Sequence, residues 1–214
     1  MSIKDFENKR WNKGDQKRVF RHDAALSLID GGTVLDLGCG DGLLLGLLRD
    51  KGVSGEGLDI SPVSVEMCLR KGIKATVHSF DDPLPYENAS FDTVILLDVL
   101  EHVYDPVPLL KEAVRVSRDG VIVGVPNFSS FPARLQTLFG RVPENNQPHK
   151  GHIYWFNYNV LCNLAKKTGV TISMFKANTF RPFSKLLPAV IRMMPNLFAL
   201  SFVVFLKKGI NDSD

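Results

Sequence analysis

Cysteine is scarce in this 214-residue chain, which contains only Cys39, Cys68 and Cys162 and no CxxC pair. An odd, widely spaced set of cysteines is typical of reduced thiols and does not predict a disulfide framework or a cysteine zinc site. The first residues also lack the apolar run that a signal peptide requires. We therefore expect a cytoplasmic protein whose core forms without disulfides or structural metals.

A strong excess of charge and a long apolar run are missing as well. The chain has 26 Lys and Arg against 23 Asp and Glu, a formal net charge of +3, and the basic residues are scattered. A nucleic-acid-binding protein would present a dense basic face, so we expect no nucleic-acid partner. No stretch approaches the roughly 18 uninterrupted apolar residues of a membrane-spanning helix.

Predicted strands and helices alternate along most of the chain. This rhythm predicts a parallel sheet covered by helices on both faces, a Rossmann-like α/β fold. The predicted strands are 33–37, 55–60, 75–78, 91–97, 120–125, 171–177 and 200–207, and the predicted helices are 15–30, 43–49, 61–71, 105–116 and 160–168.

Three segments depart from this rhythm. Residues 1–30 are interpreted as an N-terminal helical extension, loosely ordered over 1–14, ahead of one domain at 31–214. Residues 126–156 are rich in Pro, Asn, Phe and Arg and predict an irregular, lid-like insertion. The apolar stretch 182–199 is expected to be a helix on the sheet, with a partner surface or peripheral membrane contact as alternatives.

A glycine-rich loop carries the clearest chemical signal. Val34-Leu-Asp-Leu-Gly-Cys-Gly-Asp-Gly42 follows a predicted strand and opens a helix, where glycines allow backbone to approach a ligand closely. The third glycine of a dinucleotide fingerprint would fall at Leu43. Asp36 and Asp41 would repel a pyrophosphate and attract a cation. The loop therefore favours a cationic ligand such as S-adenosylmethionine (SAM) over NAD, and a nicotinamide-dependent oxidoreductase is disfavoured.

Asp59 ends the second predicted strand, 23 residues after Asp36. An acid at roughly this offset is placed to accept the ribose hydroxyls of an adenosine. The alternative is a capping role, because Ser61-Pro62 begins a helix immediately afterwards. Given the glycine loop upstream, we favour the ribose role.

The motifs VLDLGCGDG, GLDIS and SFDTVILLDVLEHV together resemble the class I SAM-dependent methyltransferase superfamily over residues 33 to about 125. The resemblance implies a seven-stranded, mostly parallel sheet, with SAM as cofactor and S-adenosylhomocysteine as product. It implies that Asp36 lies near the methionine amino group, that the loop passes beneath the cofactor, and that Leu97 lies beside it. The cofactor-binding residues implied are Asp36, Gly38, Cys39, Gly40, Asp59, Ile60, Phe80, Asp81 and Leu97.

One position departs from the superfamily pattern. Where many relatives have an acid near the adenine amino group, this chain has Phe80 in the stretch Ser79-Phe-Asp-Asp82. Either Asp81 makes that contact after a shift of one residue, or Phe80 forms an apolar wall against adenine. We favour Asp81.

A closer resemblance extends to about residue 168. VPNFSSFPARLQTLFGRVP, with HIYWFN downstream, resembles the MetW-type methionine-biosynthesis proteins. These have the methyltransferase fold and are linked as partners to homoserine O-acyltransferase. The segment Asp98-Val-Leu-Glu-His102 looks instead like generic small-molecule methyltransferases.

Candidate acceptor-binding residues follow the fourth strand and occupy the insertion: Glu101, His102, Asn127, Arg134 and His149. Glu101 and His102 offer an acid and a base, although neighbours on a helix point in different directions. His149 and His152 form a His-x-x-His pair, but no Cys or third His is close in sequence, and we expect no metal. Tyr154, Trp155 and Phe156 either cover the site or begin the next helix, with Trp155 expected in the core.

Direct methyl transfer needs alignment more than strong acid or base groups, so no catalytic residue is assigned. The leading hypothesis is a SAM-dependent methyltransferase acting on a small-molecule acceptor. The alternative is a MetW-like partner of homoserine O-acyltransferase.

Overall fold

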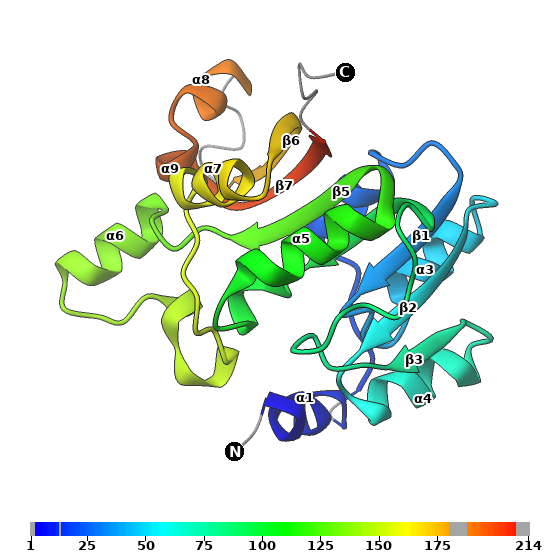
Figure 1. The fold of residues 1–214 in the computed structure, drawn as a ribbon. Helices are drawn as coiled ribbons and strands as arrows, with labels where there is room; N and C mark the ends of the chain where they lie inside the picture. The colour runs from blue at the N-terminus through cyan, green and yellow to red at the C-terminus, as the bar shows by residue number, and fades with distance from the viewer. Residues whose placement is uncertain (1–2, 13, 180–187, 209–214) are drawn as a thin grey trace.

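The computed structural model describes residues 3–12, 14–179 and 188–208, drawn in colour in Figure 1. In chain order the elements are α1 Ile3–Trp11, α2 Phe20–Leu26, β1 Thr33–Leu37, α3 Leu43–Arg49, β2 Ser54–Asp59, α4 Pro62–Arg70, β3 Ala75–Val77, β4 Phe91–Leu97, η1 Leu100–His102, α5 Pro106–Val116, β5 Ser117–Pro126, α6 Phe131–Leu138, η2 Glu144–Asn146, η3 Pro148–Lys150, α7 Tyr158–Lys167, β6 Val170–Thr179, α8 Pro188–Met193, α9 Pro195–Phe198 and β7 Ala199–Lys208.

The described strands form one seven-stranded sheet in the order β3-β2-β1-β4-β5-β7-β6. β1 to β5 pair in parallel, and β7 runs antiparallel to both β5 and β6. The chain reverses its crossover direction at β1 and β4, whose carboxyl ends meet at the edge where ligands bind in open α/β sheets. The predicted fold class is confirmed.

Successive residues of the central strands point to opposite faces of the sheet and pack in two separate hydrophobic cores. Leu35, Val94 and Val121 pack on one face with α5 and α7. Val34 and Ile95 pack on the opposite face with α2 and α3. Strands buried on both faces read as continuous apolar runs, which is why 33–37 and 91–97 stood out in the sequence.

Two predicted helix starts are confirmed in atomic detail. The Ser61 Oγ accepts a hydrogen bond from the Ser64 amide at 3.3 Å, and Pro62 is the first residue of α4. Asp105 caps α5 in the same way, because its Oδ1 accepts a hydrogen bond from the Val107 amide at 3.0 Å. These caps fix the helices that follow β2 and β4.

The N-terminal prediction was partly wrong. Residues 3–11 form a helix whose Trp11 is buried, and α2 covers only Phe20–Leu26 of the predicted helix at 15–30. The cause is tertiary packing, since the Asn8 side chain accepts a hydrogen bond from the Ser61 hydroxyl at 2.6 Å. Contacts with distant residues override the polar composition of this segment.

The insertion also contains more regular structure than predicted. Residues 131–138 form α6, and two short 3₁₀ turns follow before α7. Figure 1 shows α6 projecting away from the sheet. Trp155 was placed in the core by prediction but is 61% exposed, whereas Phe156 is fully buried. Neither belongs to α7, which begins at Tyr158.

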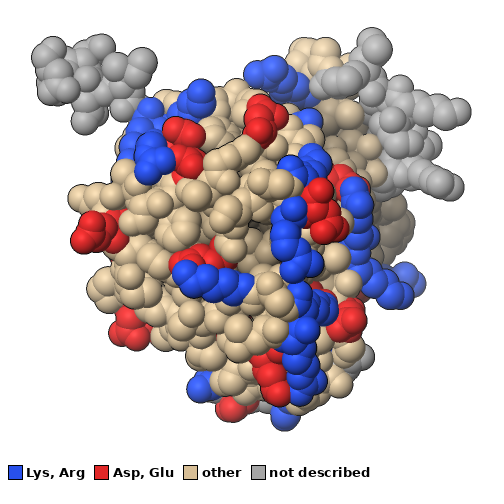
Figure 2. Space-filling view, turned by 90° about the vertical axis from the view of Figure 1, so that its right-hand side faces the viewer, with Lys and Arg blue, Asp and Glu red and all other residues tan. Residues whose placement is uncertain are grey.

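The apolar stretch 182–199 includes α8 and α9, while 182–187 lie outside the described residues. In the described part of the chain, no helix combines the length and apolarity needed to cross a membrane. On the face shown in Figure 2, Lys and Arg side chains are interspersed with Asp and Glu.

Candidate functional site

Two adjoining cavities lie at the carboxyl edge of the parallel strands. The first, here called the glycine-loop cavity, has a volume of about 270 Å³, and its lining includes Gly38, Asp59, Ile60, Phe80, Asp81 and Leu97. The second, here called the histidine cavity, has a volume of about 510 Å³ and is lined by Glu101, His102, His149 and His152 among others. Arg10, Asp98 and His102 line both, so the two cavities share a wall.

The glycine loop needs its glycines for conformation and for space. Gly38 and Gly40 have φ of 74° and 56°, a left-handed backbone that side-chain-bearing residues rarely adopt. A Cβ at Gly38 would overlap the Val99 side chain, and one at Gly40 would overlap the Trp11 ring. The loop therefore lies in direct contact with residues that bound the cavity.

Asp59 holds the loop in place. Its Oδ2 accepts a hydrogen bond from the Gly40 amide at 2.9 Å, and its Oδ1 accepts one from the Ser61 amide at 2.9 Å. The side chain also lines the glycine-loop cavity. Burial raises the pKa of this carboxyl, although the two amide donors oppose that effect. Asp59 therefore both holds the loop and forms part of the cavity lining.

The two acids of the loop differ. Asp36 is buried, and burial together with the nearby Asp59 raises its pKa to about 8. Asp41 forms an ion pair with Lys71 at 2.7 Å and accepts the Gln16 amide at 3.1 Å. The sequence predicts that both acids attract a cation, but the ion pair with Lys71 offsets the charge of Asp41. Asp36 and Asp59 are therefore the acids of this region that a cationic ligand would meet, and Asp36 would lose its proton when such a ligand binds.

Cys39 contributes backbone rather than side chain to the loop. Its Sγ lies 3.9 Å from the Sγ of Cys68 in a small apolar core with Val65. Both thiols are free and buried. The Cys39 side chain therefore points away from the glycine-loop cavity.

Helix α1 supplies residues that the sequence argument missed. Glu7, Arg10 and Trp11 line the glycine-loop cavity, and Phe6 and Arg10 line the histidine cavity. The only sequence signal was a faint helical spacing of Ile3, Phe6 and Trp11 within a polar segment. This helix closes both cavities on one side.

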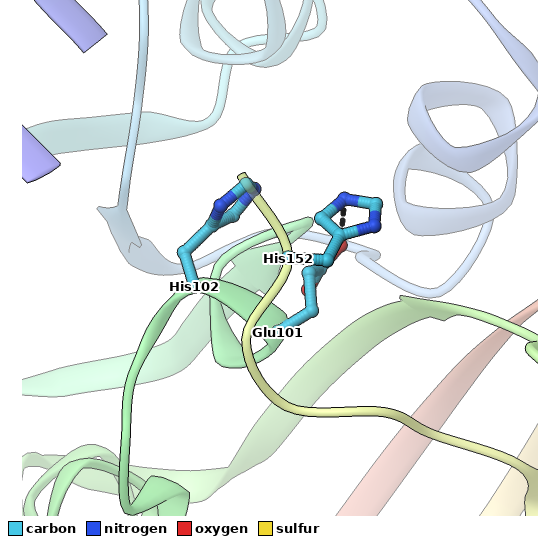
Figure 3. A group of neighbouring side chains, drawn as sticks. All are labelled: Glu101, His102 and His152. Atoms are coloured by element: carbon cyan, nitrogen blue, oxygen red, sulfur yellow. Dashed lines mark ion pairs between the residues drawn. The ribbon is translucent and has the colours of Figure 1, made fainter. Parts of the chain in front are cut away.

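Glu101, His102 and His152 lie close together, as Figure 3 shows, and all three line the histidine cavity. Glu101 and His102 belong to η1, and His152 comes from the insertion about 50 residues later. Burial raises the pKa of Glu101, with Asp98 adding to the effect, and burial lowers the pKa of His102 to about 4. Burial also lowers the pKa of His152.

Asp98 occupies the wall between the cavities in a strained conformation. Its φ of 57° is unusual for a residue with a side chain and costs about 1–3 kcal/mol. Arg21 forms an ion pair with its carboxylate. Strain of this kind is concentrated at functional sites because surrounding contacts hold it there.

Two predicted acceptor-binding residues lie elsewhere. Asn127 is fully buried and donates to backbone carbonyl groups of Asn196 and Ala199, at 3.0 and 2.7 Å. Arg134 donates to the Ser129 carbonyl at 2.7 Å and borders a separate pocket beside α8 and α9. His149 does line the histidine cavity, and its Nε2 lies 3.5 Å from Glu144. Asn127 therefore links the end of β5 to α9 and β7, Arg134 bonds within its own segment, and neither lines the two cavities.

Comparison with known families agrees with this arrangement. Residues 21–167 match the family described as "Methionine biosynthesis protein MetW". The chain belongs to the MetW family. The match covers the glycine loop, η1 and the whole insertion, and it leaves out α1, β6 and β7.

Curated relatives share less of the chain. Ubiquinone biosynthesis O-methyltransferase from Xanthomonas oryzae pv. oryzae is 29% identical over 109 residues, which cover 48% of this chain and 46% of the relative. The enzyme of the same name from Paracidovorax citrulli is 30% identical over 105 residues, covering 44% and 43%. The chain thus spans about half the length of the curated relatives it matches.

Solved structures share the fold. Magnesium protoporphyrin IX methyltransferase from Synechocystis PCC 6803, solved with bound S-adenosylhomocysteine, aligns with a TM-score of 0.71 at 18% identity over 97% of this chain and 98% of that chain. A SAM-dependent methyltransferase from Thermotoga maritima aligns with a TM-score of 0.65 at 21% identity over 88% and 87%. The fold is that of class I methyltransferases.

Proposed function

We propose that this protein is a SAM-dependent methyltransferase that acts on a small-molecule acceptor. SAM occupies the glycine-loop cavity, with Asp59 at the ribose and Phe80 and Asp81 at the adenine. The acceptor occupies the histidine cavity. Asp36, Gly38, Gly40, Ile60 and Leu97 complete the cofactor site, and Cys39 contributes through its backbone.

The adjoining pair of cavities is the observation that carries this proposal. Methyl transfer from a sulfonium is a direct displacement in which acceptor, methyl group and sulfur must lie in line. Two cavities that share Arg10, Asp98 and His102 provide one site for each reactant. The cofactor class is supported by the family match and by relatives named O-methyltransferase.

The insertion at 126–156 covers the acceptor in this proposal. Gly151 contacts the Phe6 ring so closely that a Cβ there would overlap it, and Lys150 and His152 line the histidine cavity. The insertion and α1 therefore meet above the cavity. Closing them around an acceptor would exclude water and align the reacting atoms.

Labelled SAM tests the proposal. The full-length protein, incubated with methyl-labelled SAM and a pool of low-mass metabolites, should move label into a low-mass product and form S-adenosylhomocysteine. Asp59→Ala should reduce this transfer strongly. SAM binding without transfer to any low-mass compound would contradict the enzymatic part while leaving cofactor binding intact.

A second function is favoured by the surface of the insertion. We propose as the alternative that the protein is a MetW-like partner of homoserine O-acyltransferase in the cytoplasm. Leu138, Phe139 and Val142 are 77%, 71% and 57% exposed in and just after α6. An exposed apolar group of this size on a projecting helix is typical of a protein-binding surface.

A pull-down separates the two functions. If the partner role holds, the protein should retain a homoserine O-acyltransferase from a cell extract, and the double variant Leu138→Glu, Phe139→Glu should lose it. Leu69, 57% exposed on α4, supplies the matched control Leu69→Glu. Retention of the acyltransferase by the double variant would contradict this surface.

A further inference from the structure

We propose that Glu101, His102 and His152 bind a divalent transition-metal ion at the wall of the histidine cavity. One oxygen or ring nitrogen from each residue lies within 4.8 Å of the others. Figure 3 shows the three side chains as neighbours, with a dashed line joining the ring of His152, from the insertion, to the carboxylate of Glu101 in η1. This site goes beyond the proposed methyl transfer and does not depend on it.

The buried carboxylate is the first observation that points to a ligand. Glu101 has no exposed surface, and neither carboxylate oxygen has a hydrogen bond of normal geometry. The His152 Nε2 lies 3.8 Å from Oε1, which is too far for a hydrogen bond. A buried carboxylate without a partner is costly, and a bound cation would remove that cost.

The hydrogen bonds of the two histidines are the second observation. His102 Nδ1 lies 3.1 Å from the Gly151 carbonyl oxygen, and His152 Nδ1 lies 2.8 Å from the Asn145 carbonyl oxygen. Carbonyl oxygens only accept, so each Nδ1 carries the proton and each neutral ring keeps a free lone pair on Nε2. Histidines that bind metals typically have their second nitrogen held in this way.

The donor set defines the class of ion. Two imidazole nitrogens and one carboxylate oxygen suit Zn²⁺, Fe²⁺, Co²⁺ or Mn²⁺ rather than Ca²⁺ or Mg²⁺. Donor atoms around one such ion lie about 3–3.4 Å apart at bond lengths near 2.1 Å. The most distant pair of donor atoms would therefore close from 4.8 Å by about 1.5 Å on binding, through rotation of the side chains.

Three protein ligands would leave coordination positions open to an acceptor in the histidine cavity, which Glu101, His102 and His152 line. If the proposed methyl transfer holds, an acceptor hydroxyl bound there would have a lower pKa and lose its proton to solvent. Its oxygen would then form the bond to the methyl group as the bond from methyl to sulfur breaks. This role rests on the proposed function, whereas binding of the ion does not.

Metal titration of the chelator-treated, full-length protein tests the site. Calorimetry with Zn²⁺ and Mn²⁺, and visible absorption with Co²⁺, should show one ion per chain with a dissociation constant in the micromolar range or below. Glu101→Gln, His102→Gln and His152→Gln should each weaken binding at least about tenfold. His149→Gln, in the same cavity but outside the cluster, should leave the metal affinity within about twofold of wild type.

The ligand variants must remain folded for their metal affinities to be compared with that of the wild-type protein. Glu101→Gln removes a buried unpaired carboxylate, so the ion-free variant should remain folded by circular dichroism while its metal affinity falls. Absence of binding by the wild-type protein up to millimolar Zn²⁺, Mn²⁺ and Co²⁺ would overturn the proposal. So would unchanged affinity in the folded Glu101→Gln and His152→Gln variants. SAM binding, measured separately, reports on the proposed function alone.

Discussion

Replacing Asp59 by Ala should weaken both the cofactor site and the fold. The carboxylate accepts the Gly40 and Ser61 amides, each at 2.9 Å, and is only 5% exposed. Its removal leaves two buried donors without partners, each costing about 1–3 kcal/mol. The glycine loop loses its link to β2 as a result.

The loss of SAM affinity should be separate from the loss of stability. Hydrogen bonds to a charged group contribute about 1.5–3 kcal/mol, so the dissociation constant should rise roughly 10- to 150-fold. Calorimetry with SAM at a temperature where the variant remains folded gives the affinity, and urea unfolding gives the stability.

Asp92 offers a matched control at the amino-terminal ends of the strands, on the side of the sheet away from the cavities. It accepts the Thr33 amide at 2.7 Å and the Thr33 hydroxyl at 2.9 Å, at the start of β4. Asp92→Ala should lower stability by about 1–2 kcal/mol and leave SAM affinity unchanged. An Asp59→Ala variant that binds SAM like wild type, or an equal loss of affinity in Asp92→Ala, would refute the ribose role.

Three further predictions concern protons, the N-terminal helix and the insertion. Because the Asp36 pKa is about 8, this carboxyl is mostly protonated at pH 7, and a cationic ligand should release its proton. SAM affinity should therefore rise between about pH 6 and 8 and level off above, with proton release seen by calorimetry in two buffers and absent in Asp36→Asn. The His22 Nδ1 accepts the Val19 amide at 3.0 Å, and burial lowers its pKa, so the unfolded chain binds the proton more readily. The free energy of unfolding should fall as pH drops below about 6.5. His22→Asn should reduce this pH dependence, measured by urea unfolding at a series of pH values. Hydrogen exchange should be fast over 139–152 in the free protein and slow once S-adenosylhomocysteine and an acceptor are bound, with 34–37 and 92–97 protected throughout; slow exchange over 139–152 without ligand would argue for a fixed wall.

The fold could be predicted because its signals are local. Buried parallel strands such as 33–37 and 91–97 are continuous apolar runs, and Ser61-Pro62 and Asp105-Pro106 mark helix starts by their own chemistry. The glycine loop could be found for the same reason, because positive φ at Gly38 and Gly40 demands glycine. Periodicity and turn chemistry need no knowledge of distant contacts.

Other parts of the site depend on contacts between distant residues. Trp11 covers Gly40 across 29 positions, and His152 meets Glu101 across 51, so neither pairing leaves a pattern within one segment. The pairing of Asp41 was not predicted because its partner, Lys71, lies 30 residues away at the C-cap of α4. Asn127 follows β5 like a rim residue in the sequence, but its side-chain amide donates to the carbonyl oxygens of Asn196 in α9 and Ala199 at the start of β7.

Calorimetric titration of the full-length protein with S-adenosylhomocysteine tests the central claim most directly. We predict one molecule bound per chain with a dissociation constant in the micromolar range or tighter, and no heat of binding with NAD under the same conditions. Binding of NAD without binding of S-adenosylhomocysteine would contradict the assignment of the glycine-loop cavity.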